Sequence, residues 1–278
     1  MPALPRGDTR GKARVPQILM RKLLLAALAL LAASPALCEE ESREFVSANK
    51  AYRLKVAYAG TGGGGSAKFE LMDKAGKRLS LFESRRAPFS VTISGDGRRL
   101  FALNGFWSQQ VTITDMNVYS AAGKVLARHD IRMIGPSGED FSSDFSVYAL
   151  GADPGKGGAI YVFDAATGSL RWSKKFKEKV AGVKLSGDGA RLAAVFSAGP
   201  KAFRAAVFEN DGAESWHTVV RTPNNLTPRR FSADGEEFEF WEGKMVYDEK
   251  VDYYRDTTVK KHRFRFTPSG VEPAGDAD

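Results

Sequence analysis

A four-residue pattern, Ser-x-Asp-Gly, returns along this chain at multiples of about 46 residues. It follows an apolar run at Ser94–Gly97 and again at Ser186–Gly189, and a third copy begins at Ser232. The three serines are 92 and 46 residues apart, so degenerate copies are expected at Ser142 and at Ser47. A fixed period of this length indicates one structural unit repeated in tandem, and it outranks any local signal.

A second mark, a glycine that ends a short polar turn, recurs with the same period. Successive copies are 47, 45 and 44 residues apart, and they are Gly76, Gly123, Gly168 and Gly212. Both marks are typical of tight turns, because Ser and Asp side chains bond to the local backbone and glycine takes positive φ. The segments between them are short, apolar and β-compatible, and no helical period is evident beyond the leader. Each unit therefore predicts four antiparallel strands.

These turns resemble the repeats of WD40-like, YVTN and TolB-type β-propellers, in which a Ser-Pro-Asp-Gly turn joins the first two strands of a blade. The resemblance covers residues 43 to about 266, and it implies an all-β fold, a small β-propeller of five four-stranded antiparallel blades. One such domain, residues 39–278, is expected. Its units are expected near residues 43–87, 88–137, 138–179, 180–227 and 228–266. The fifth unit lacks the second glycine, so the sequence leaves closure of the ring open.

A leader precedes the repeats in residues 1–38. Two basic residues, the apolar run Leu23–Ala33 and small residues up to Cys38 follow one another in the order of a signal peptide, with Met20 as the expected true start. Cleavage is expected after Ala36 or after Cys38, and the leucine before the cysteine disfavours its lipidation. The run is too short to span a bilayer, which needs about 20 residues. We therefore expect an exported protein, periplasmic or extracellular, without a membrane span after cleavage.

The basic charge of the chain belongs mostly to this leader. The whole sequence has 41 Lys and Arg against 33 Asp and Glu, a net charge of +8. Residues 1–38 hold six of the basic residues and one of the acids, which leaves 35 against 32, or a net charge of +3, in residues 39–278. Nucleic acid is therefore not an expected partner.

The ligand-binding face is predicted from the connections. The turns within the two marks are uniformly tight, whereas the loops between the second and third strands and between units are long and varied, and such loops usually carry binding groups. The candidates on this face are Arg85, Arg86, Phe106, Trp107, Lys174 and Lys175. The aromatic pair fits an exposed anchor or a side chain packed between blades, and the cations fit a patch for an acidic partner or simply solvated charge.

Two functions stay open. The first is a non-catalytic binding or scaffolding propeller whose partner is a protein or polymer of the cell envelope or outside the cell. The alternative is a polysaccharide hydrolase or lyase, for which the available acids are Glu44, Glu139 and Asp140. The sequence predicts no cofactor and no metal site, since its three histidines are expected on outer strands. The segment Val162–Trp172 also resembles the repeat of pyrroloquinoline-quinone dehydrogenases, but eight such blades would not fit the length.

Overall fold

The computed structural model describes residues 41–59, 65–107, 111–248 and 253–275. The leader, with its expected start, cleavage sites and Cys38, lies outside these residues. The described chain consists of strands and turns, and no helix of membrane-spanning length and apolarity occurs in it.

The described residues form twenty strands, which follow one another in sequence. They are β1 (Ser42–Val46), β2 (Tyr52–Ala59), β3 (Ser66–Asp73), β4 (Arg78–Ser84), β5 (Pro88–Ile93), β6 (Arg99–Trp107), β7 (Val111–Ser120), β8 (Val125–Met133), β9 (Gly135–Phe141), β10 (Val147–Asp153), β11 (Gly158–Asp164), β12 (Leu170–Phe176), β13 (Lys179–Leu185), β14 (Arg191–Gly199), β15 (Ala202–Glu209), β16 (Glu214–Arg221), β17 (Asn225–Phe231), β18 (Glu237–Asp248), β19 (Tyr253–Thr267) and β20 (Gly270–Pro273).

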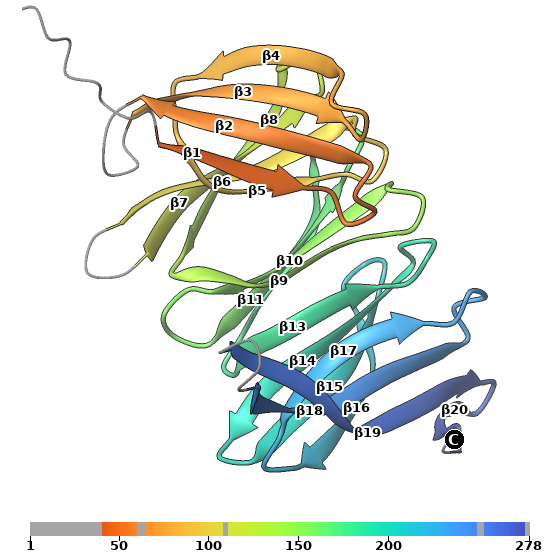
Figure 1. The fold of residues 1–278 in the computed structure, drawn as a ribbon. Coiled ribbons are helices and arrows are strands. Elements are labelled where there is room, and N and C mark those ends of the chain that lie inside the picture. Colours follow the sequence, from red (N-terminus) through yellow and green to blue (C-terminus); the bar gives the residue numbers. More distant parts are fainter. Residues whose placement is uncertain (1–40, 60–64, 108–110, 249–252, 276–278) are drawn as a thin grey trace, which may run out of the picture. The chain divides into compact units, whose positions relative to one another are not determined.

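Each consecutive set of four strands forms one antiparallel sheet in which neighbours in sequence are neighbours in space (Figure 1). We call these sheets blades 1 to 5, from β1–β4 to β17–β20. The predicted fold class is confirmed: the chain is all-β and is built from five four-stranded antiparallel units. The fifth blade ends with β20, beyond the expected limit of that unit at Phe266.

One turn geometry joins the first two strands of every blade. In the second blade, Ser94 Oγ bonds to Asp96 Oδ1 at 2.6 Å and accepts the backbone N–H of Arg99 at 2.9 Å. The fourth residue of each turn has positive φ, between 57° and 73°, and these residues are Lys50, Gly97, Phe145, Gly189 and Gly235. The degenerate copies near residues 47 and 142 are therefore true copies, although two of the five left-handed positions are not glycine.

Lys50 offers a direct test of this geometry. Its φ of 57° is costly for a residue with a Cβ atom, and glycine removes that cost. We expect Lys50→Gly to raise the free energy of unfolding by about 0.5–1 kcal/mol, measured by urea denaturation. Lys50→Ala is the control, because it removes the charge and keeps the Cβ atom. Equal stability of the two variants would contradict the expected backbone effect.

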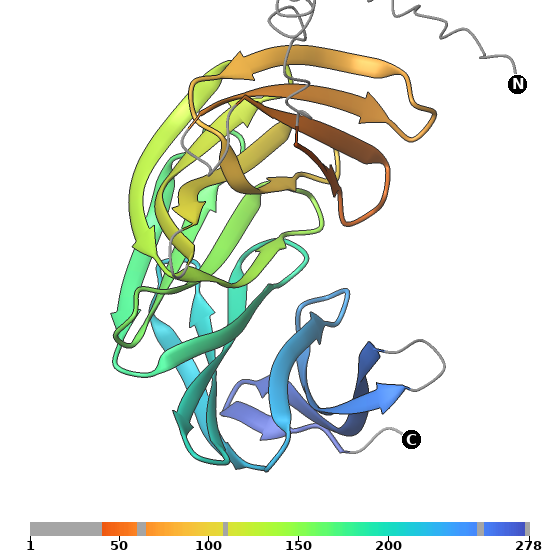
Figure 2. The ribbon, with the colours of Figure 1, turned by 60° about the vertical axis from the view of Figure 1, so that its left-hand side comes forward.

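The hydrophobic core lies between blades. The blades follow one another in sequence order (Figure 2). In the described residues, four buried clusters each join two consecutive blades through apolar side chains. Each boundary also has an aromatic contact between its two blades, with ring centroids 4.0 to 5.7 Å apart: Phe69 with Tyr119, Phe101 with Tyr148, Phe176 with Phe208, and Trp216 with Phe238. None of the four clusters joins blade 5 to blade 1, so the ring is not closed in the described residues.

Hydrogen bonds on the tight-turn side also tie each blade to the next. Asn49 Nδ2 donates to the carbonyl of Gly95 at 2.7 Å, and Arg191 donates to the carbonyl of Gly235 at 2.9 Å. The other two boundaries have equivalent bonds, from Arg99 to Ala166 and from Ser143 to Gly187. This side of the molecule therefore carries a repeated structural role.

The outer faces of blade 1 and blade 5 are polar, whereas the faces that pack between consecutive blades are apolar. The face of blade 1 turned away from blade 2 carries alternating charged residues on β2 and β3, such as Arg53, Lys55 and Lys68, which are exposed. The corresponding face of blade 5 carries Glu239 among arginines. Polar outer faces are what the terminal units of a repeat array need to stay soluble. The polar outer faces of blades 1 and 5 therefore act as caps at the two ends of an open row of blades.

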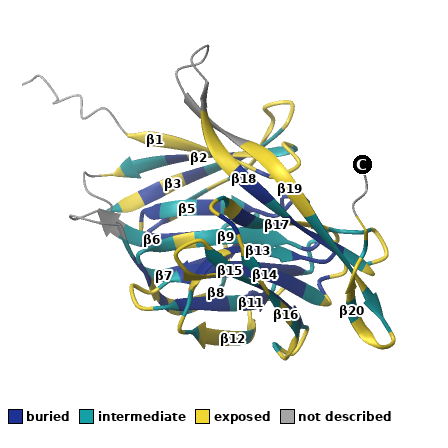
Figure 3. Ribbon diagram, turned by 90° about the horizontal axis from the view of Figure 1, so that it is seen from below, coloured by how far each residue is buried: buried dark blue, intermediate teal, exposed yellow. Residues whose placement is uncertain are grey.

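Blade 5 departs from the others in length. Strands β18 and β19 pair over twelve residue pairs, from Glu237 with Arg265 to Asp248 with Tyr253. The first strand β17 covers β18 only as far as Gly243, so the hairpin continues beyond the blade. Figure 3 shows this extension as an exposed arm. Met245 and Val259 on it are 52% and 53% exposed.

Candidate functional site

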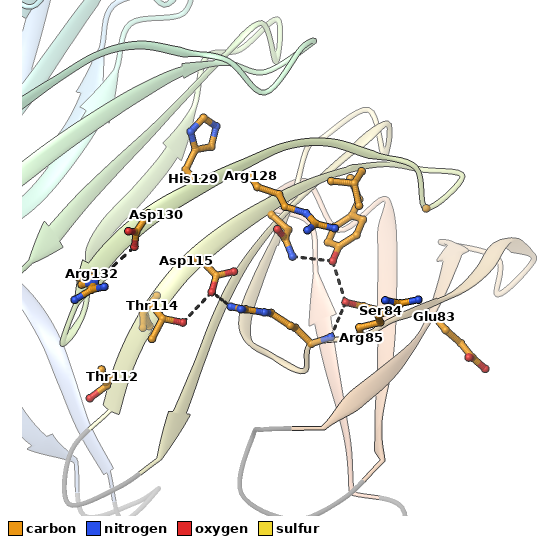
Figure 4. A pocket seen from close by; sticks show the side chains of 16 residues that line it. Glu83, Ser84, Arg85, Thr112, Thr114, Asp115, Arg128, His129, Asp130 and Arg132 are labelled. Carbon is orange, nitrogen blue, oxygen red and sulfur yellow. Dashed lines mark hydrogen bonds and ion pairs between the residues drawn. The ribbon is translucent and has the colours of Figure 1, made fainter.

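A groove of about 930 Å³ lies between the outer strand β4 of blade 1 and the strands β7 and β8 of blade 2 (Figure 4). It extends from the connection between β4 and β5 to the turn at Gly123, which joins β7 to β8. Most of its lining is polar or charged, and the charged residues are Glu83, Arg85, Arg86, Asp115, Arg128, Asp130 and Arg132.

A buried hydrogen-bond network forms the floor of the groove. The Tyr119 hydroxyl lies 2.9 Å from Ser84 Oγ, across the boundary between the two blades. Asn117 Nδ2 donates to the same hydroxyl at 3.1 Å. All three residues are buried, with exposures of 3%, 7% and 5% respectively. Because each buried polar group has a partner in this network, the floor is rigid.

Asp115 anchors the wall next to this floor. Its carboxylate accepts hydrogen bonds from Asn104 Nδ2 and from Thr114 Oγ1, both at 2.8 Å. Arg86, from the connection between β4 and β5, forms an ion pair with the same carboxylate. Asp115 therefore holds Arg86 across the groove, and the pair bridges blade 1 and blade 2.

The remaining cations of the groove are differently engaged. Arg132 lies 3.7 Å from Asp130, and both side chains are strongly exposed. Arg85 and Arg128 are exposed and form no ion pair with any residue of the described chain. Two guanidinium groups of the groove are thus available to an anionic group, and arginine binds carboxylates in a bidentate manner.

The residues predicted for the ligand-binding face are divided by the structure. Arg85 and Arg86 lie in the connection between β4 and β5 and line the groove, as their predicted loop position implies. Phe106 and Trp107 end strand β6, opposite Thr112 and Val111, and are not in a loop. Their side chains lie outside the described residues.

Lys174 and Lys175 are also in a strand, β12, the outermost of blade 3. They had been expected in the loop after it. The strand continues through this basic run because an outer strand has a solvated edge and tolerates lysine. Lys174 Nζ lies 5.4 Å from the ring centroid of Phe208 in blade 4. Nothing in the described residues links these lysines to the groove.

The acids considered for catalysis do not form a pair. Glu44 is exposed on β1, 3.8 Å from Arg53. Glu139 and Asp140 lie on the inner strand β9 and face opposite neighbours: Glu139 accepts a hydrogen bond from Thr92 of blade 2, and Asp140 accepts the backbone N–H of Leu185 of blade 4 at 2.7 Å. Lys184 Nζ also contacts Asp140 at 2.8 Å. These two carboxyl groups tie inner strands together.

Burial raises the pKa of Glu139, and the hydrogen bond from Thr92 only partly opposes this effect. The Tyr148 hydroxyl is buried beside the same carboxyl. Its own burial and the nearby Glu139 raise the pKa of Tyr148 well above its usual value. The site therefore favours an uncharged carboxyl group.

Glu139→Gln is expected to stabilise the protein at neutral pH. Because the folded pKa of Glu139 is raised, its favourable contribution is present below the unfolded pKa and is lost as the pH rises through the folded value. Glutamine stays neutral and still accepts the bond from Thr92, so we expect a gain of about 1 kcal/mol at pH 7 and little difference at pH 4. Denaturation curves at the two pH values test this. A loss of stability at pH 7 would show that the ionised form is the favoured one.

The histidines lie in separate blades. His129 on β8 contacts the carbonyl of Gly168 at 2.6 Å, and His217 on β16 lies 2.9 Å from Glu214. His262 had been expected on an outer strand but lies on β19, the third strand, where Nε2 is 2.7 Å from Glu242. In the described part of the chain, no three potential metal ligands come together.

No known family model matches this chain, and no curated protein matches it. Solved structures, in contrast, do match this chain. Hydrazine synthase from Kuenenia stuttgartiensis is 15% identical, with a TM-score of 0.48, over 83% of this chain and 64% of that chain. A β-propeller domain from Myceliophteria thermophila is 14% identical, with a TM-score of 0.40, over 78% and 71% of the two chains. A putative TolB from Agrobacterium tumefaciens is 15% identical, with a TM-score of 0.44, over 84% and 80%.

The chain has the β-propeller repeat architecture. Its five four-stranded sheets in sequence order and the four cores between consecutive sheets establish this directly. The chain spans 64% of the length of the hydrazine synthase chain that it matches. At no more than 15% identity and with TM-scores below 0.5, these three structures indicate nothing about the ligand of this protein.

Several groove residues were not found by the sequence analysis, notably Asp115, Asn117 and Tyr119. All three lie on β7 and face blade 1. A signal was present, since polar residues alternate with the buried Met116 and Val118 of the same strand. This alternation did not reveal which residues of β7 face the groove, because both faces of an inner blade are covered by neighbouring blades.

Proposed function

We propose that this protein is an exported, non-catalytic binding or scaffolding propeller, and that it binds a partner bearing carboxylate groups in the groove between blades 1 and 2. The observation that carries the proposal is the presence of two unpaired guanidinium groups, Arg85 and Arg128, above a rigid polar floor. A preformed cavity with a few fixed polar groups is the usual form of a ligand site.

The geometry favours recognition over chemistry. Arg86 is already neutralised by Asp115, so it fixes the wall of the groove, and Arg85 and Arg128 are the groups free to bind. The buried Tyr119 and Asn117 side chains are bonded to each other and form the fixed floor below them. The inward acids Glu139 and Asp140 are engaged by other blades, which removes the support for the hydrolase or lyase alternative.

The test uses two soluble carboxylate polymers, poly-L-glutamate and polygalacturonate, which represent a protein and a polysaccharide source. We expect the full chain to bind one of them, with an affinity at least tenfold lower in the Arg85→Glu/Arg128→Glu variant. The matched control is Lys174→Glu/Lys175→Glu, which makes the same charge change on β12 and should leave binding within twofold.

Equal loss of affinity in the two double variants would mean that only net charge matters, and it would refute the groove as the binding site. Binding to neither polymer would also refute a carboxylate ligand. Release of shorter saccharides from polygalacturonate would overturn the non-catalytic proposal.

A further inference from the structure

The outer edge of strand β19 is unpaired over most of its length. Strand β20 pairs only with the last part of β19, from Phe264 to Thr267. The next contact on this edge is the bond from the Ala274 N–H to the carbonyl of Arg263 at 2.9 Å. From Tyr253 to His262, no strand of the described chain pairs with this edge, while the inner edge is paired with β18 at every residue except Val259. Such an edge presents a row of free N–H and C=O groups to another chain.

The side chains along this edge are exposed and strongly basic. Residues 257–261 are all exposed, and Val259 among them is 53% exposed. Lys260, Lys261, His262 and Arg263 follow one another, and Arg265 continues the series on the same face as Arg263. A one-residue irregularity opposite Glu242 and Gly243 interrupts the ladder near Val259.

Strand β17 adds to the positive charge on this face. A bulge between Pro228 and Arg230 places Arg229 and Arg230 on one face of the sheet, since Arg229 lies 5.0 Å from the ring centroid of Trp241 and Arg230 bonds to Glu239. Lys261 lies 5.3 Å from the same indole. Among the described side chains, five cations, Arg229, Arg230, Lys261, Arg263 and Arg265, therefore share the outer face with three acids, Glu237, Glu239 and Glu272.

This charge determines which partner can use the edge. A second copy of the chain would bring an equal basic run to the same ladder, and like charges placed opposite each other are destabilising. An extended segment rich in Glu or Asp would place its carboxylates against the cations of β19. It would also satisfy the free backbone groups by forming an additional strand.

We propose that the outer edge of β19, over residues 257–262, binds an acidic, extended polypeptide segment of a partner protein by β-strand addition. This surface is in blade 5 and is independent of the groove proposed above. Main-chain hydrogen bonds supply the affinity, and the basic run supplies the selectivity.

The test titrates the full chain with a fluorescent octapeptide of alternating Val and Glu and follows its anisotropy. We expect binding that weakens at least tenfold for the same peptide with N-methyl groups on alternate residues, because these remove the backbone donors and keep the charge. A Val-Lys peptide should bind at least tenfold more weakly than the Val-Glu peptide. The Lys260→Glu/Lys261→Glu variant should also lose at least tenfold, with circular dichroism to verify that it folds.

The Lys174→Glu/Lys175→Glu variant makes the same charge change on β12, outside both the edge and the groove, and should bind the Val-Glu peptide as the natural chain does. Equal binding of the N-methylated peptide would overturn strand addition. Equal binding of the Val-Lys peptide, or no effect of the lysine substitutions, would overturn the assignment to the basic edge.

Discussion

Replacing Gly123 by alanine is expected to lower the free energy of unfolding by about 2–4 kcal/mol, whereas Gly76→Ala should cost only about 1 kcal/mol. Both glycines end the turn between the third and fourth strands of a blade, and both have φ near +80°. They differ in their surroundings. A Cβ atom on Gly123 would lie 2.3 Å from Cγ of Phe82 in blade 1, while nothing lies within 4 Å of one on Gly76.

The neighbour of Gly123 cannot move away without cost. Phe82 stacks on Phe69 with ring centroids 4.9 Å apart, and it also lies 5.6 Å from Tyr119. Forcing a methyl group into such a contact costs about 1–3 kcal/mol beyond the backbone term that the two variants share. Urea denaturation of both variants measures the difference. Equal losses would show that the turn alone matters and that blade 1 does not pack closely on Gly123.

Glu239→Gln is expected to cost about 2–3 kcal/mol at pH 7. The Glu239 side chain is 4% exposed on the outer face of blade 5. Arg230 donates to both of its oxygens at 3.0 Å, Arg263 donates to Oε1 at 2.8 and 3.0 Å, and Trp241 Nε1 donates to Oε2 at 2.9 Å. Burial opposes ionisation, but these hydrogen bonds outweigh it and lower the pKa of Glu239 to about 2.

The lowered pKa of Glu239 determines how its contribution to stability changes with pH. Because the folded pKa is lower than the usual value of 4.5, the stabilisation is fully present above pH 4.5 and is lost as the pH falls towards about 2. The full shift corresponds to about 3 kcal/mol, and we expect somewhat less because Arg230 is 61% exposed and water screens its charge.

The difference in stability between Glu239→Gln and the natural chain should therefore shrink as the pH is lowered from 5 to 2.5. Glu237→Gln is the matched control, since Glu237 pairs with the exposed Arg265 on the same sheet and should cost less than about 1 kcal/mol. A pH-independent difference would show that the cost is one of packing. A cost equal to that of the control would show that burial adds nothing at Glu239.

The sequence predicted the repeating unit of the fold closely because a tight turn is a local structure. Its residue types determine the backbone angles and the side-chain bonds within a few positions. The period also located the two degenerate turns, where Lys50 and Phe145 adopt the left-handed conformation usual for glycine. At these two positions the pairing of the strands on both sides fixes the positive φ angle. This pairing outweighs the usual preference for glycine there.

The site was predicted in part. Arg85 and Arg86 were found because a long, charged connection differs visibly from the short turns. Arg128 and Tyr119 were not, since each lies within a regular strand and only the adjoining blade determines what it faces. Glu139 and Asp140 were named as available acids for the alternative hydrolase or lyase function. They are instead bonded to opposite neighbours, because adjacent residues of a strand point to opposite faces.

The 46-residue period, read from the sequence alone, determined the number of units, the four strands in each and the turns that join the first two, since these depend on contacts within one unit. Only the tertiary structure decided which faces are covered, where the groove lies and that the ring stays open. These features depend on packing between units, and the residues that pack together are more than 40 positions apart in the sequence. Both faces of a strand follow the same two-residue alternation, so the alternation does not show which face a neighbouring blade covers. The polar faces of blades 1 and 5 are the clearest case, because their charged residues cap the array where no neighbouring blade covers the sheet.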